Sequence, residues 1–139
     1  MKLIKKINLE PTAAFVLHYS KEVYINKTVK EYLKNIDLTS ADNILKMCKN
    51  KNIEHLLLNA MSNRKYMITK LVLDALKIKK YKQIVIFASG KSPLSMEIVL
   101  NVKDDIIIYE IDNSSLKEKQ SVYKNLLKNS EYNKINFLE

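Results

Sequence analysis

Apolar residues recur at helical spacing in the first part of the chain, starting just after Pro11. Thr12 is suited to cap the start of this helix, because its hydroxyl can accept a backbone N–H of the first turn. The apolar or small residues that share one side of it are Ala13, Val16, Leu17, Ser20, Val23 and Tyr24. The pattern therefore predicts a first helix that begins at Pro11-Thr12.

Three more helices are predicted before residue 80. A short one covers 29–35, and a third is capped by Thr39 or Ser40. A long one runs from 53 to 76 or 78, with a break expected near Ser62-Asn63, because both side chains compete for backbone hydrogen bonds. Residues 1–80 thus read as a helical cap.

The pattern changes after Lys82, where short runs of β-branched and aromatic residues replace the helical spacing. Such runs with almost no charge are typical of strands buried on both faces of a parallel sheet. The predicted elements are a strand over 83–88, a helix over 94–100, a strand over 106–111, a helix from a cap at residue 113, 114 or 115 to about 128, and a strand over 134–138. This alternation predicts an α/β fold: a helical cap, then the first half of a Rossmann-like, doubly wound parallel sheet over 81–139.

The only glycine of the chain, Gly90, follows the first of these strands. Glycine tolerates positive φ and lets a ligand approach the backbone closely, and ligands of such sheets bind outside the carboxyl ends of the strands. Asp112 follows the next strand 22 residues later, the separation at which a carboxylate can accept hydrogen bonds from ribose. An ordinary turn and a solvated aspartate are the alternative, since no GxGxxG is present.

Composition narrows the classes of function. The net charge is +9, but its lysines are spread along the chain, which disfavours a nucleic-acid partner. One cysteine, Cys48, allows no internal disulfide, and His18 and His55 have no metal-ligand spacing with it, so we expect no metal site. No run of about 18 apolar residues predicts a membrane span, and the start has no secretory signal, so a cytoplasmic location is expected.

Four motifs, in this order, resemble the S-adenosylmethionine-dependent leucine carboxyl methyltransferase family and its bacterial O-methyltransferase relatives. The first is Thr12-Ala13 at a helix start, and the second is the segment 63–69 (NRKYMIT), which contains the only arginine, Arg64, and corresponds to the family's R-T-x-x-I-D. The third is QIVIFASGKSP from Gln83, which corresponds to Q-V-V-x-L-G-A-G-x-D-T. The fourth is Glu110-x-Asp112 followed by Lys119. The likeness covers nearly the whole chain, but only the front half of the family's length.

The resemblance implies a role for each matching residue. Arg64 would grip the methionine carboxylate of the cofactor, Gly90 would line its methionine and ribose portion, and Asp112 would hold the ribose hydroxyls. Glu110 and Lys119 would support the strand end and the next helix. The implied cofactor-binding set is Arg64, Ala88, Ser89, Gly90, Glu110 and Asp112. No catalytic residue is implied, because a carboxylate acceptor needs no general base.

The departures from the family pattern keep two functions open. Ala88 stands at the first loop glycine, Ser92 at the loop aspartate and Thr69 at the aspartate of the arginine helix. The family's later strands have no counterpart. The chain is therefore expected to be a methyltransferase-like protein that is truncated or needs a partner chain, acting on a small-molecule or carboxylate acceptor, or else a non-catalytic binding or assembly module. A half-built sheet exposes an edge, so a homodimer or a complementing C-terminal-half chain is expected.

Overall fold

The computed structural model describes residues 6–79, 81–113 and 116–139. The chain divides into two compact units, Met1–Ile68 and Thr69–Glu139. Their boundary falls inside the longest helix, α4 (Glu54–Lys79), whereas the sequence suggested a division after residue 80.

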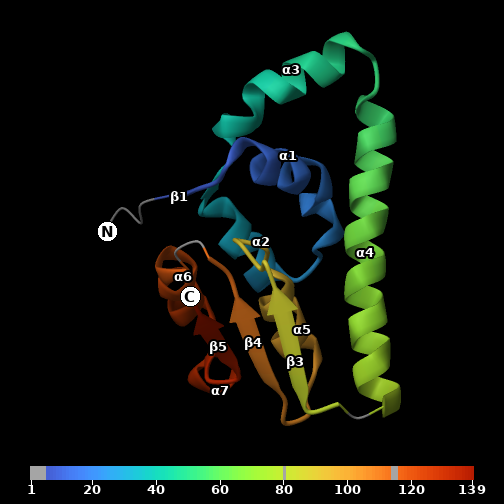
Figure 1. Ribbon diagram of the computed structural model, residues 1–139. Coiled ribbons are helices and arrows are strands. Elements are labelled where there is room, and N and C mark those ends of the chain that lie inside the picture. Colours follow the sequence, from blue (N-terminus) through green and yellow to red (C-terminus); the bar gives the residue numbers. More distant parts are fainter. Residues whose placement is uncertain (1–5, 80, 114–115) are drawn as a thin grey trace. The chain divides into compact units, whose positions relative to one another are not determined.

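The first unit is mainly helical (Figure 1). Its elements are β1 (Ile7–Asn8), α1 (Pro11–Ser20), the 3-10 helix η1 (Lys21–Val23), α2 (Lys27–Lys34), β2 (Ile36–Asp37), the 3-10 helix η2 (Thr39–Ala41), α3 (Asp42–Asn50) and the first part of α4. The strands β1 and β2 form a parallel pair, in which Ile7 is opposite Ile36 and Asn8 is opposite Asp37. Both isoleucines are buried. This short pair was not predicted.

Helix starts differ from the predictions by a few residues. The cap of α1 is Glu10, and Pro11 is the first helical residue, so the predicted cap at Thr12 is wrong. Proline fits this position because its missing N–H would have no helical partner. The next helix, α2, is capped by Asn26, whose side-chain oxygen accepts the N–H of Thr28 at 2.9 Å.

The long helix α4 has no break near Ser62-Asn63, which corrects the prediction. The hydroxyl of Ser62 donates to the backbone carbonyl of Tyr19 at 2.8 Å. Because this hydroxyl bonds to a residue outside the helix, it does not compete with the hydrogen bonds of its own backbone. The hydroxyl on which the predicted break depended is thus bonded to a residue 43 positions away.

The second unit alternates strands and helices as predicted. Its elements after α4 are β3 (Gln83–Phe87), α5 (Leu94–Asn101), β4 (Ile107–Ile111), α6 (Lys117–Leu126), α7 (Asn129–Tyr132) and β5 (Ile135–Leu138). The strands are parallel, in the order β3-β4-β5. The prediction of an α/β fold is confirmed. The short helix α7 was not predicted, and the possible caps Ser114 and Ser115 lie outside the described residues.

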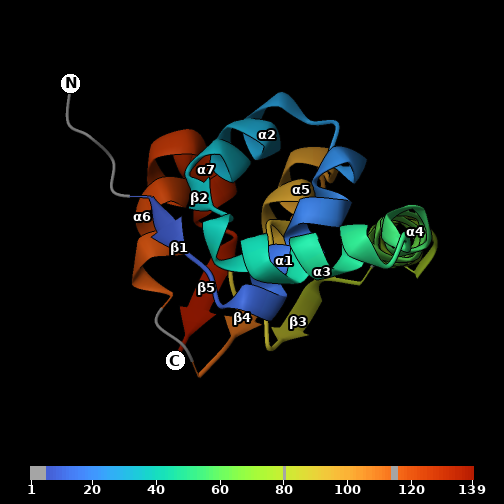
Figure 2. The same ribbon diagram turned by 90° about the horizontal axis from the view of Figure 1, so that it is seen from above.

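Helices cover one face of this sheet. Both crossovers step in the same direction, and crossovers of one hand then place their helices on one side. Figures 1 and 2 show α5 and α6 together on that side. Ile108 and Ile135 are buried there, and the fully buried Met96, Ile98 and Leu116 come from the covering segments.

The opposite face of the sheet is apolar and open. Val85 is 48 % exposed, Phe87 is 74 % exposed, and Leu138 is 46 % exposed. The register places Phe87, Ile111 and Leu138 in one row across the three strands. The prediction that the first strand is buried on both faces is therefore wrong, and β3 is an edge strand with one exposed side.

Candidate functional site

The loop after β3 contains two residues in the left-handed region, Ala88 at φ 50° and Gly90 at φ 48°. A Cβ built onto Gly90 would have no atom within 4 Å. Glycine is therefore favoured there by backbone conformation and not by lack of space. Ala88 adopts nearly the same φ with a methyl group, which strains the backbone. Its side chain is exposed.

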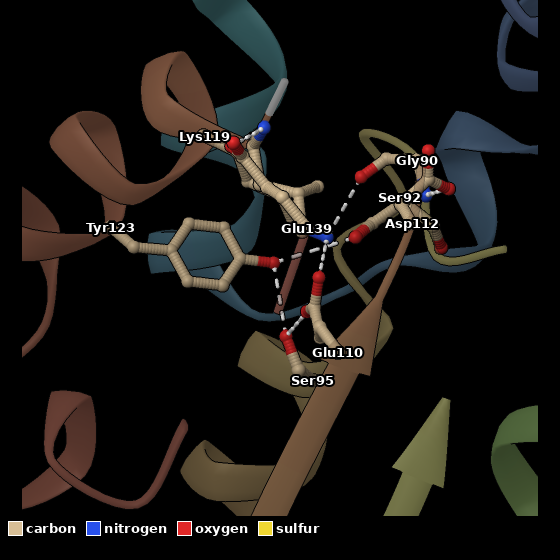
Figure 3. Close-up of polar contacts among 9 residues, drawn as sticks. Gly90, Ser92, Ser95, Glu110, Asp112, Lys119, Tyr123 and Glu139 are labelled. Carbon is tan, nitrogen blue, oxygen red and sulfur yellow. Dashed lines mark hydrogen bonds and ion pairs between the residues drawn. The ribbon is translucent and has the colours of Figure 1, made fainter. Parts of the chain in front are cut away.

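Asp112 lies directly against this loop (Figure 3). The N–H of Gly90 donates to Oδ2 of Asp112 at 2.8 Å. Two backbone bonds hold the same region, from the N–H of Ser89 to the carbonyl of Ile111 at 3.3 Å and from the N–H of Asp112 to the carbonyl of Leu138 at 3.2 Å. The glycine and the carboxylate that the sequence singled out at a spacing of 22 are thus in contact, at the carboxyl ends of β3 and β4.

A buried ion pair lies beneath the loop. The ammonium of Lys119 on α6 contacts the carboxylate of Glu110 on β4, and the two residues are 0 % and 1 % exposed. Lys119 also donates to the carbonyl of Gly90 at 3.2 Å. Burial lowers the pKa of Lys119, and the carboxylate of Glu110 opposes that shift. The pair connects β4, α6 and the glycine loop, the region where the resemblance placed both residues.

Two residues that sequence reasoning missed complete the network around this pair. The hydroxyl of Ser95, in the first turn of α5, donates to Glu110 and lies 3.3 Å from the hydroxyl of Tyr123. Tyr123 donates to the carbonyl of Ser92 at 3.4 Å, and its ring centroid lies 5.4 Å from Nζ of Lys119. One available signal was the spacing of Tyr123 four residues after Lys119, which puts both on one side of a helix.

Ser89, like Pro93, is buried in the loop. Its side chain is 5 % exposed, and its Oγ has no hydrogen-bond partner in the part of the chain that the structure describes. A buried hydroxyl without a partner costs about 1–3 kcal/mol. Ser89 therefore places an unsatisfied buried polar atom directly before Gly90 in the loop.

Arg64 belongs to the first unit, on α4, where its side chain is exposed. The first unit also has a cavity of about 290 Å³, lined by Asn8, Leu9, Asp37, Thr39 and Ser40. The N–H of Thr39 donates to Asp37 at 3.0 Å, and bonds from Thr39 lower the pKa of that carboxyl. This turn accounts for the polar lining of the cavity.

Metal-ligating side chains do not gather in groups of three or more anywhere in the described ranges. Within those same ranges, no helix is long and apolar enough to span a bilayer. No family model, no curated protein and no solved structure matches this chain.

Proposed function

We propose that the chain is an S-adenosylmethionine-dependent methyltransferase-like protein of the cytoplasm, and that the loop at 88–93 with Asp112 binds the cofactor. The contact of 2.8 Å between the N–H of Gly90 and the carboxylate of Asp112 is the observation that carries the proposal. It brings a positive-φ backbone and an acceptor for ribose hydroxyls to one place at the strand ends, where ligands of open α/β sheets bind.

The residues of the second unit fit a nucleoside-bearing cofactor in three respects. Gly90 has open space where a Cβ would be, so a ligand can approach its backbone. Ser89 supplies a buried hydroxyl without a partner among the described residues. A carboxylate has about four lone-pair sites, so Asp112 can accept ribose hydroxyls without losing its bond to Gly90.

The cofactor, when bound, would supply an activated methyl group for transfer to a small-molecule or carboxylate acceptor. The protein would contribute by positioning the cofactor for this transfer. Lys119 and Asp112 hold Gly90 from its carbonyl and its N–H, and Glu110 keeps Lys119 in place. Orientation of this kind contributes to catalysis by fixing the reacting geometry before the reaction starts.

The second candidate function is a non-catalytic binding or assembly module derived from such an enzyme. The open apolar face of the sheet favours it, because Val85 and Phe87 would be shielded from water by a partner. A second copy or a complementing chain would fill this role. Sedimentation of the purified chain tests it, and a monomer at every concentration would argue against self-association.

Calorimetric titration with S-adenosylmethionine and its demethylated product tests the cofactor proposal. We expect saturable binding that Asp112→Ala abolishes. Asp105→Ala is the matched control, because it removes the same charge from an exposed residue before β4, at the opposite end of the strand. If neither ligand binds, or if both variants bind equally well, the cofactor proposal is wrong and the assembly module is favoured.

A further inference from the structure

We infer that the cavity at the carboxyl ends of β1 and β2 binds a small neutral polyol, such as a monosaccharide. This site lies within the first unit and is independent of the proposed function. The cavity has a volume of about 290 Å³, which corresponds to the liquid volume of about ten water molecules. Ligands of larger parallel sheets bind at the same end of the strands. The lining residues end the two strands or follow them: Asn8, Leu9, Asp37, Thr39 and Ser40.

The short strand pair brings an amide and a carboxylate together at this cavity. Asn8 is opposite Asp37 in the parallel register, one position after the buried pair of Ile7 and Ile36. Successive side chains of a strand point to opposite faces, so Asn8 and Asp37 share the face that the isoleucines do not use. Neighbouring strands lie about 4.8 Å apart, which is close enough for both side chains to bond to adjacent hydroxyls of one ligand.

The carboxylate of Asp37 has acceptor capacity left for a ligand. Its Oδ1 accepts the N–H of Thr39 at 3.0 Å, and the side chain of Thr39 also bonds to this carboxylate. Both bonds come from one residue, whereas an ionised carboxylate offers about four acceptor sites. Because Asp37 is only half-buried and lines the cavity, a ligand can reach the remaining sites. The bonds to Thr39 also fix the orientation of the carboxylate before a ligand binds.

The charges near the cavity favour a neutral ligand over a cation or an anion. The ammonium group of Lys6 acts on Asp37 and lowers its pKa, so a positive charge already offsets part of the carboxylate's charge. The net charge of +9 of the whole chain also disfavours a cation. An anion would lie beside the ionised Asp37 and be repelled by it. A neutral ligand avoids both penalties.

The other polar groups of the lining match hydroxyls. The amide of Asn8 and the hydroxyl of Ser40 each donate and accept hydrogen bonds, whereas Asp37 only accepts. Hydroxyls also donate and accept, so the adjacent hydroxyls of a polyol can bond to all three side chains. Asn8 and Ser40 are exposed, so a ligand reaches them without rearrangement, and Leu9 offers an apolar contact to a carbon skeleton.

NMR titration of the ¹⁵N-labelled full chain with glucose and with myo-inositol tests this inference. The readout is the backbone amide signals of residues 8, 9 and 37–40. We expect saturable shifts of these signals with a Kd in the millimolar range, which is about what a ligand of ten to twelve non-hydrogen atoms gains. Inorganic phosphate and 1,4-diaminobutane should cause no saturable shift of the same signals over the same concentrations.

Two variants identify the side chains that hold the polyol. Asn8→Ala removes the amide and should weaken binding by about two- to tenfold, as the loss of one neutral hydrogen bond does. Asp37→Asn keeps an acceptor for the N–H of Thr39 but removes the charge, which should weaken binding by about five- to tenfold. Asn50→Ala is the matched control, because it makes the same change as Asn8→Ala at an exposed residue at the end of α3, outside the lining. Unchanged amide signals of α1 show that each variant is folded.

Several outcomes would overturn the inference. Shifts that grow linearly with polyol concentration without saturating, or no shifts at all, mean that the cavity does not bind polyols. Equal affinities of the unaltered chain, Asn8→Ala and Asp37→Asn would show that any binding occurs elsewhere. If phosphate or the diamine binds and the polyols do not, the cavity accepts a charged ligand and the assignment of a neutral one is wrong.

Discussion

Removing one member of the buried pair of Glu110 and Lys119 should strongly destabilise the second unit. In Glu110→Gln, the ammonium of Lys119 would stay buried with the carbonyl of Gly90 as a neutral partner. Removing one member of a buried pair costs about 3–5 kcal/mol. A unit of this size has a free energy of unfolding of about 4–11 kcal/mol. The single substitution should therefore remove a large part of the stability of this unit.

A double variant shows whether the charges themselves cause this loss. Glu110→Leu with Lys119→Met replaces the pair by apolar side chains, which is often neutral or stabilising for buried pairs. The hydroxyl of Ser95 and the carbonyl of Gly90 then each lose a partner, at about 1–3 kcal/mol per group. The double variant should still be more stable than the sum of the two single effects predicts, by about 1–3 kcal/mol.

The loss of stability in Glu110→Gln should also depend on pH. The pKa of Lys119 is lowered by burial and raised by Glu110, so without that carboxylate it falls further. Between the lowered pKa of the folded state and the ordinary value of 10.5, the unfolded chain binds the proton and the folded chain does not. Stability rises with pH in that range. The difference in stability between this variant and the unaltered chain should therefore narrow as the pH is raised through that range.

Urea unfolding, followed by the amide signals of β4 and α6, measures these effects within the second unit. The matched control is Glu118→Gln, one position before Lys119 on α6, where the side chain is exposed. That variant should stay within about 0.5 kcal/mol of the unaltered chain. If Glu110→Gln behaves like Glu118→Gln, or if its loss does not change with pH, the buried pair does not contribute as argued.

Three further perturbations test other parts of the structure. Gly90→Ala should destabilise the protein by about 1 kcal/mol through positive φ alone, and Ala88→Gly should be neutral or stabilising by a similar amount. If thermal unfolding shows that both variants are destabilised, the backbone argument is contradicted. Ile108→Ala on the covered face should lower the free energy of unfolding by about 2–5 kcal/mol. Phe87→Ser on the open face should lower it by under about 1 kcal/mol and should weaken any self-association. Similar losses of stability for the two variants in urea would disprove that the faces differ. The carboxyl of Asp37 should titrate below its ordinary 3.8, so its turn stabilises above that pH and is lost as the pH falls through the folded-state value; a midpoint at or above 3.8 by NMR would refute this.

The strands β3 and β4 were predictable because each is mainly a run of β-branched and aromatic residues between polar segments. The exposure of one face of the sheet could not be predicted. The run of Ile, Val and Phe in β3 has no polar residue at alternate positions, so the pattern could not distinguish a face that is covered from one that is exposed. Which face is covered depends on where α5 and α6 pack, and that is a property of the tertiary structure.

Features that depend on distant contacts escaped the sequence for the same reason. The strands β1 and β2 have two residues each, too few for any periodicity. In α4, the hydroxyl of Ser62 donates to the carbonyl of Tyr19, 43 residues away, which no local pattern predicts. Among the site residues, Gly90 and Asp112 were singled out by their spacing, but the hydrogen bond between them was not predicted. Ser95 joins the network only because α5 packs on β4.

Both backbone groups of Gly90, its N–H and its carbonyl, are hydrogen-bonded. Its N–H donates to Asp112 and its carbonyl accepts from Lys119, which is in turn fixed by Glu110. Both bonds are made within the protein, so the loop has its shape before any ligand arrives. A loop ordered in advance spares binding the cost of ordering it. One residue at positive φ, fixed from both sides, thus leaves an open backbone position beside a carboxylate.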